Sequence, residues 1–147
     1  MATKTPTRSP THEDVPFDRL AALGMELEEI AEGDQVTLAD LVELAEDRGR
    51  PPSHYLAALP LATELTVAPS TGVEVRVCAG TCQRYGALPL LDHLVERRLK
   101  GGDYTITPVE CLDRCDTGPA CELRSASGNL VLAPATPSAI DEALDSL

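Results

Sequence analysis

The stretch that decides the fold is VEVRVCAGTC, residues 73–82, where a strand pattern runs directly into a pair of cysteines. From residue 73 to residue 77, valines alternate with charged side chains, which is the period-two pattern of a β-strand with one buried face. Cys78 stands at the end of this strand, and Cys82 follows after a short loop. A strand therefore leads into a loop that carries two thiols.

A second cysteine pair, Cys111 and Cys115, has the same spacing and follows a second strand pattern at residues 104–109. Four thiolates supplied in two short-range pairs are the ligands of a 2Fe-2S cluster or of a tetrahedral zinc ion. Each pair can bind from one loop while the fold brings the two loops together. The sequence therefore predicts a metal site formed by Cys78, Cys82, Cys111 and Cys115.

Helix and hairpin patterns complete the second half of the chain. The apolar residues of 88–100, Leu99 among them, recur with helical spacing and are followed by two glycines. Two short apolar segments, 120–123 and 130–133, are expected to form a hairpin, and a last helix is expected over 137–147. The order strand–helix–strand, then strand–strand–helix, is typical of a thioredoxin-like α/β layer.

The first half of the chain carries helix signals instead. We expect a helix over residues 16–32, where Phe17 and four later apolar residues recur at helical spacing on one buried face. Thr37 is a favourable N-cap for a second helix over 38–47, which a glycine would close. A third helical piece is expected over 53–59.

Two segments of different composition separate these parts. Residues 67–72 contain proline, serine and glycine and are interpreted as a linker. The first residues lack a hydrophobic period, so we expect them to be mobile. The chain is therefore predicted to comprise a mobile tail (1–13), an N-terminal helical bundle (14–66) and an α/β domain (67–147).

The composition limits the partners that this chain can bind. Its 147 residues include 12 basic and 24 acidic side chains, for a formal net charge of -12. Such a charge repels phosphate backbones and anionic lipid, which argues against nucleic-acid binding and favours a basic or neutral protein partner. We find no signal-peptide core and no membrane-spanning run of about 18 apolar residues, so we expect a soluble, cytoplasmic protein.

A reducing cytoplasm disfavours structural disulfides and leaves other uses for the five cysteines. A closed zinc site would also use four thiolates, although paired cysteines in zinc motifs mostly have two intervening residues. A redox disulfide would need the Cys-x-x-Cys spacing, which neither pair has. The fifth cysteine, Cys121, is expected to be buried in an apolar strand, or to serve as a replacement ligand if Cys78 is displaced.

Other polar residues carry no site prediction. His54 and His93 lie within helical patterns and have no second ligand at a metal spacing, so we expect surface or packing roles for them. The acidic run from Glu26 to Glu32 is expected on a solvated helix face, where it could also meet a basic partner. No glycine-rich dinucleotide fingerprint or phosphate loop occurs.

Two motifs, VCAGTC (77–82) and CLDRCDTGP (111–119), resemble those of the thioredoxin-like 2Fe-2S ferredoxin family. The chain is similar to the small iron-sulfur subunit of NADH:quinone oxidoreductase, the E subunit of bacterial complex I, and to its counterparts in NAD-linked formate dehydrogenases and hydrogenases. Those proteins carry a helical bundle before the ferredoxin domain, which LADLVELAEDRG (38–49) resembles. The resemblance thus covers roughly residues 16–147.

The chain departs from the family pattern at both cysteine pairs. The family usually has four residues between the first two cysteines rather than three, which bears on the position of Cys78 more than on that of Cys82. Asp113 and Arg114 stand where the family commonly has glycine. Charged groups beside a cluster shift its reduction potential, so Asp113 and Arg114 are expected to affect the potential of a cluster bound here.

The resemblance implies an electron-transfer subunit in which Cys78, Cys82, Cys111 and Cys115 hold one 2Fe-2S cluster. Such a subunit is not catalytic alone and docks on a flavin- and NAD-binding iron-sulfur subunit, which supplies FMN and NAD. The resemblance leaves open whether the complex acts on NADH, formate or hydrogen, and in which direction the electrons run. The alternatives are a zinc-stabilised adaptor of the same fold and a free-standing ferredoxin, and an exposed apolar patch on the helical bundle would favour the fixed subunit.

Overall fold

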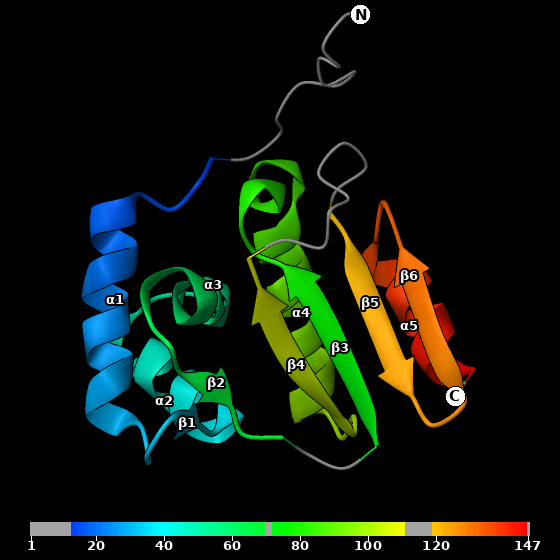
Figure 1. The fold of residues 1–147 in the computed structure, drawn as a ribbon, viewed down its shortest axis with the longest axis horizontal. Coiled ribbons are helices and arrows are strands. Elements are labelled where there is room, and N and C mark those ends of the chain that lie inside the picture. Colours follow the sequence, from blue (N-terminus) through cyan, green and yellow to red (C-terminus); the bar gives the residue numbers. More distant parts are fainter. Residues whose placement is uncertain (1–12, 70–71, 111–118, 147) are drawn as a thin grey trace, which may run out of the picture.

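The fold is a mixed α/β structure, with helices packed beside and behind a sheet (Figure 1). The computed structural model describes residues 13–69, 72–110 and 119–146. In order, the elements are α1 (Phe17–Ile30), β1 (Gln35–Val36), α2 (Leu38–Arg48), α3 (Pro52–Ala62), β2 (Thr66–Val67), β3 (Val73–Cys78), the 3₁₀-helix η1 (Thr81–Tyr85), α4 (Ala87–Leu99), β4 (Tyr104–Val109), β5 (Cys121–Ser125), β6 (Gly128–Leu132) and α5 (Pro137–Asp145). Within the described ranges, no helix is both long enough and apolar enough to cross a bilayer.

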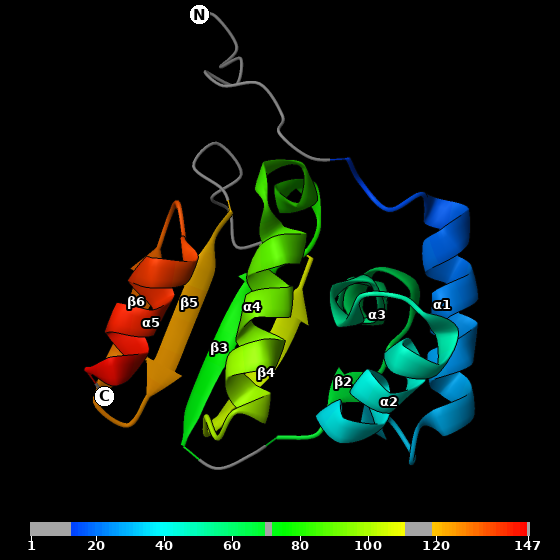
Figure 2. The ribbon, with the colours of Figure 1, turned by 180° about the vertical axis from the view of Figure 1, so that it is seen from behind.

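The main sheet has the strand order β4-β3-β5-β6. β3 and β4 are parallel and are joined by the crossover helix α4, whereas β5 pairs antiparallel with both β3 and β6. Helices α4 and α5 lie on the same face of this sheet, behind it in Figure 1 and in front of it in Figure 2. The predicted α/β class is therefore confirmed, as are the two strands, the hairpin and both helices of this half.

The alternating sequence of β3 separates a buried face from a polar one. Val75 and Val77 are fully buried in the same core cluster as the leucines of α4. Arg76, between them, points to the opposite face, where it lies 3.7 Å from Glu122 of β5. Because the helices cover one face alone, an apolar and a charged side chain can alternate along the strand without a charge entering the core.

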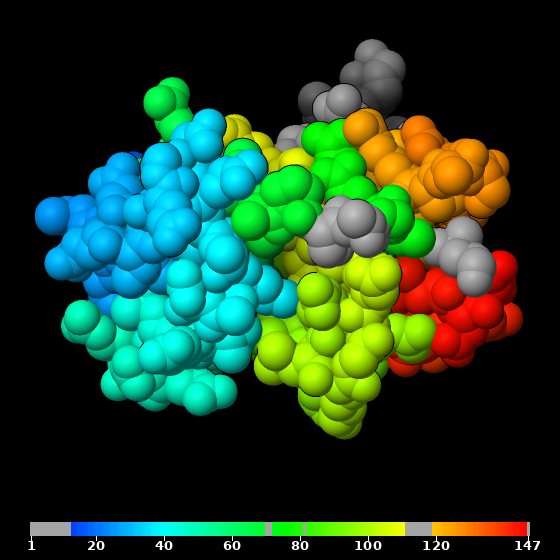
Figure 3. All heavy atoms as spheres, turned by 90° about the horizontal axis from the view of Figure 1, so that it is seen from below, coloured from blue at the N-terminus to red at the C-terminus, as the bar shows by residue number. Residues whose placement is uncertain are grey.

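Helix α3 joins the N-terminal helices to the sheet. Its residues 55–59 are all buried, and it packs against α1, α2, α4 and β4. A helix that is apolar all round needs neighbours on every side. One core cluster consequently runs from Val15 to Ile140, and Figure 3 shows the N-terminal helices, in blue and cyan, packed against the later elements. The helix extends at both ends beyond the predicted range 53–59.

Polar contacts fix α3 against two neighbouring helices. The backbone N–H and the hydroxyl of Ser53 donate to the two carboxylate oxygens of Asp92 in α4, at 2.9 and 2.8 Å. The first N–H groups of a helix have no partner within it, so Asp92 acts as an N-cap from another helix. The Tyr55 hydroxyl donates to Glu26 of α1 at 2.8 Å. The prediction that Glu26 belongs to a solvated run is therefore wrong, because its carboxylate is an acceptor between two packed helices.

The predicted helix caps are confirmed. Thr37 Oγ1 accepts a hydrogen bond from the Asp40 N–H at 3.1 Å. Gly49 ends α2 with a φ of 67°, a left-handed conformation that favours glycine. These signals lie within a few residues of each other, which is why the sequence predicts them well.

Two residues predicted on buried helix faces are exposed instead. Phe17 and Leu99 belong to the apolar stripes of α1 and α4, yet they are 74% and 59% exposed. Each is a terminal residue of its helix. In each helix the apolar stripe therefore extends to a terminal residue that none of the described neighbouring elements covers.

The interpretation of residues 67–72 as a linker is wrong at its start. Val67 belongs to β2, which pairs in parallel with β1 and places Val36 opposite Val67, both buried. Strands of two residues are too short to show a period, so the sequence gives no signal for them. Residues 70–71 lie outside the described ranges, as does most of the predicted tail.

We expect Asp92→Ala to lower the free energy of unfolding by about 1–3 kcal/mol, because two donors at the start of α3 lose their acceptor. Urea titration followed by circular dichroism measures this change. Asp92→Asn retains one acceptor oxygen, so its free energy of unfolding should fall by less than that of Asp92→Ala. Asp103→Ala, at an exposed position, is the control, and equal stability of the two alanine variants would contradict the capping role.

Candidate metal centre

Cys78 and Cys82 lie together in a small buried cluster at one end of the main sheet. Cys78 is the last residue of β3, and Cys82 lies in η1, the turn that follows. Both are buried, and the cluster that contains them is otherwise made of alanines, Ala87 and Ala120, with Ala133 packed against it. The structure thus brings the first predicted pair together, surrounded by the smallest apolar side chains.

Backbone hydrogen bonds connect this cluster to the neighbouring strands. The Cys78 N–H donates to the Ala120 carbonyl at 3.1 Å, and the Ala79 N–H donates to the Val109 carbonyl at 2.7 Å. The Cys78 thiol donates to the Glu110 carbonyl at 3.5 Å. Residues on both flanks of the segment 111–118 therefore lie beside Cys78.

The second predicted pair, Cys111 and Cys115, lies outside the described residues. Across residues 13–69, 72–110 and 119–146, no group of three or more His, Cys, Asp or Glu side chains could hold a metal ion. Of the four predicted ligands, the described residues therefore include Cys78 and Cys82 alone. A complete site would need both cysteines of the segment 111–118.

Gly80 is required by a close approach between the cysteine loop and the end of β4. A Cβ atom at this position would overlap the backbone carbonyl oxygen of Glu110. Backbone cannot yield as a flexible side chain can, so no other residue fits without a shift of the loop. The glycine keeps the loop that carries both thiols against the residue that precedes Cys111.

Gln83 is a buried polar residue that the sequence did not identify. Its Nε2 donates to the Ala79 carbonyl at 2.7 Å, and its Oε1 accepts from the Val15 N–H at 2.8 Å. Nearby, Arg84 Nε lies 3.0 Å from an Asp14 carboxylate oxygen. The segment before α1 is thereby fastened onto the cysteine loop. A glutamine between Cys82 and Arg84 carries no sequence signal of such a contact.

Cys121 occupies a different environment from the first pair. It lies opposite Val77 in the β3–β5 register and is buried in the main core cluster, apart from the cluster of Cys78 and Cys82. Burial, with a smaller contribution from the charge of Glu122, raises the pKa of Cys121 to about 12. A protonated, core-packed thiol fits the expected core role and disfavours the replacement-ligand role.

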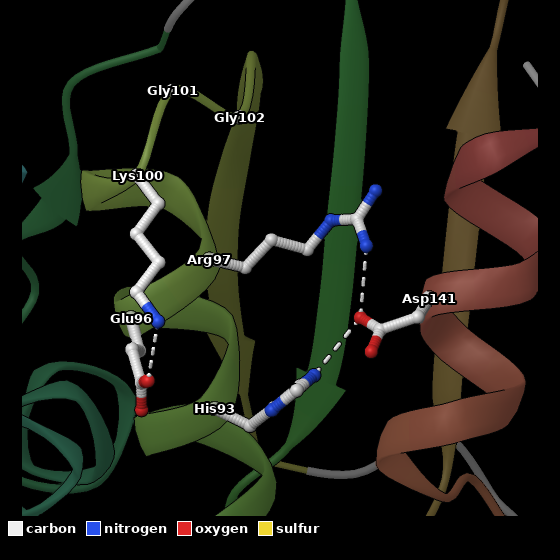
Figure 4. A pocket seen from close by; sticks show the side chains of 7 residues that line it. All are labelled: His93, Glu96, Arg97, Lys100, Gly101, Gly102 and Asp141. Carbon is white, nitrogen blue, oxygen red and sulfur yellow. Dashed lines mark hydrogen bonds and ion pairs between the residues drawn. The ribbon is translucent and has the colours of Figure 1, made fainter.

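A polar cavity of about 370 Å³ between α4 and α5 is a second place where charged groups gather (Figure 4). Asp141 accepts from His93 Nε2 at 2.9 Å and from Arg97 Nη1 at 3.0 Å. Lys100 pairs with Glu96 at 2.9 Å on the same helix. Both basic side chains that line the cavity, Arg97 and Lys100, already have a carboxylate partner. The contacts of His93 and Arg97 with Asp141 hold α5 against α4, so His93 has the packing role expected of it.

We expect Gly80→Ala to destabilise the protein by about 1–3 kcal/mol, the usual cost of forcing an extra carbon into a packed site. The local effect should be a faster hydrogen-exchange rate at the Ala79 amide, because its hydrogen bond to Val109 lies beside the clash between the new Cβ and the Glu110 carbonyl. Nuclear magnetic resonance measures both quantities in one sample. An unchanged exchange rate at Ala79 would show that the loop does not need glycine.

The raised pKa of Cys121 predicts that its thiol resists alkylation in the folded protein. Iodoacetamide reacts with thiolates, and at pH 8 the Cys121 thiol remains protonated and buried. We expect mass spectrometry to find Cys121 unmodified in the folded protein and fully modified after unfolding in guanidinium. Rapid modification of the folded protein would contradict its placement in the core.

The comparisons with known proteins add no relative to this description. The chain matches no known protein-family model, and no curated protein matches it. The assignment of a function therefore depends on the residues and the geometry described above.

Proposed function

We propose that this protein is an electron-transfer subunit that carries one 2Fe-2S cluster bound by Cys78, Cys82, Cys111 and Cys115. The observation that carries the proposal is the arrangement around Cys78. Residues on both flanks of the segment 111–118, Glu110 and Ala120, contact Cys78 directly, while Cys82 shares its buried cluster. Such an arrangement is what two cysteine pairs need if they are to share one metal centre.

The sheet supports the finer fold assignment that we propose, a thioredoxin-like domain after an N-terminal helical bundle. The parallel β3–α4–β4 unit, the antiparallel β5–β6 hairpin and the final α5 follow the order expected for that fold. The strand order β4-β3-β5-β6 places the first strand of the unit at the centre. The three helices α1, α2 and α3 precede it, as in the subunits that the sequence resembles.

The surroundings of the first cysteine pair fit an iron-sulfur cluster. Thiolates are the ligands that such clusters use, the neighbouring side chains are small alanines, and Gly80 permits a close backbone approach. When bound, the cluster would supply one-electron transfer. The protein would hold the ligands and keep water from Cys78 and Cys82, whose exposed fractions are 1% and 0%.

An exposed apolar stripe on α1 favours a fixed subunit over a free-standing ferredoxin. Phe17 and Met25 are 74% and 69% exposed, and Ala21 lies between them at helical spacing. Exposed apolar side chains that share one helix face are suited to contact with a protein partner. We propose the flavin- and NAD-binding subunit of an NAD-linked dehydrogenase or hydrogenase as that partner, with FMN and NAD bound there.

Anaerobic purification of the full chain tests the metal assignment. We expect about two irons and two acid-labile sulfides per chain, with a visible chromophore that dithionite bleaches. Serine in place of any one of the four proposed ligands should remove most of the iron. The matched control is Cys121→Ser, which should retain the iron because Cys121 lies in the main core.

Other metal contents would contradict the proposal in distinct ways. One zinc per chain without colour would support the zinc-stabilised adaptor. A metal-free protein purified with reduced cysteines would exclude both. Iron lost from Cys121→Ser and kept in Cys78→Ser would mean that the shorter first loop has changed the ligand set.

A further inference from the structure

A groove lies between α1 and the end of α3. It has a volume of about 610 Å³. Its apolar wall consists of Phe17, Ala21, Leu61 and Leu65. Gly24 allows this pairing of helices, since a Cβ there would come within 3.0 Å of the Thr63 side chain.

The charged residues of the groove all have the same sign. Glu28, Asp34 and Glu64 line it, and no basic side chain is among its lining residues in the described part of the chain. All three carboxylates are exposed. None of the three forms an ion pair with another described residue. The groove therefore offers unneutralised negative charge next to an apolar wall.

The dimensions of the groove fit one helix. Phe17 and Glu28 are eleven positions apart on α1, which corresponds to about 16 Å, or three helical turns. Grooves between two helices commonly accept the apolar face of an amphipathic helix. A segment with Leu-type side chains on one face and Lys or Arg beside them would match both the apolar wall and the carboxylates.

We infer that this groove binds a basic amphipathic helix of the partner subunit. The inference rests on the proposed function in taking a protein partner as the occupant. A neighbouring depression contains Gly80, Gln83 and Arg84 of the cysteine loop, and it shares Phe17 and Leu61 with the groove. A helix bound here would therefore lie next to the loop of Cys78 and Cys82, where an electron acceptor or donor has to approach.

Binding of designed peptides to the full chain tests the inference. The probes are two 18-residue amphipathic peptides with the same leucine face and one tryptophan, the first with lysine and the second with glutamate on the polar face. This chain contains no tryptophan, so peptide fluorescence reports binding directly. We expect the lysine peptide to bind at physiological salt and the glutamate peptide to bind at least about tenfold more weakly.

Variants separate binding in the groove from general attraction to an acidic protein. In the groove variant Glu28→Gln/Asp34→Asn/Glu64→Gln, the affinity for the lysine peptide should fall about tenfold. The control variant Glu43→Gln/Glu46→Gln/Asp47→Asn loses the same number of charges from exposed positions of α2 and should change affinity little.

Two further variants test the apolar wall. Phe17→Ala should lower the affinity for the lysine peptide about fivefold to tenfold, and Ala21→Lys should lower it by charge repulsion. Leu99→Ala, at an exposed position of α4, should leave the affinity unchanged. Equal losses in the two charge variants, unchanged affinity of both wall variants, or no binding of either peptide would each overturn the inference. These outcomes are independent of the iron content, so a failure here would leave the proposed cluster untouched.

Discussion

The parallel pairing of β3 with β4 is the constraint on which the rest of the structure depends. Parallel neighbours need a crossover, so α4 covers one face of the sheet, and the carboxyl ends of both strands come to the same edge. There the Ala79 N–H donates to Val109, and the Cys78 N–H donates to Ala120 of the strand on the other side. These backbone hydrogen bonds hold the cysteine loop between its neighbours.

Helix α3 has the second structural role, because its residues 55–59 are apolar and buried on all sides by neighbouring elements. It fixes the N-terminal helices on the sheet, and the Ser53–Asp92 contact fixes its orientation. The segment before α1 then reaches the cysteine loop, where Val15 donates to Gln83. An extension that precedes the α/β unit in the chain thereby becomes part of the environment of the proposed metal centre.

Much of this fold could be predicted from the sequence, because the signals are local. The valine alternation of β3, the Thr37 cap and the Gly49 terminus each depend on a few adjacent residues. The pairing of Cys78 with Cys82 is local in the same sense. The strands β1 and β2, the ends of α3 and the exposure of Phe17 could not be predicted, since each depends on which distant element lies alongside.

The sequence by itself determined the strands of the main sheet, the five α-helices of the described residues, the net negative charge and the positions in the chain where thiols could bind a metal. The tertiary structure decided which of those residues share an environment. It separated Cys121 from Cys78, although the two are neighbours across the β3–β5 ladder, because alternate residues of a strand point to opposite faces. It also gave Gln83 and Gly80 their roles, since hydrogen bonds and close approaches between distant segments leave no periodic mark in a sequence.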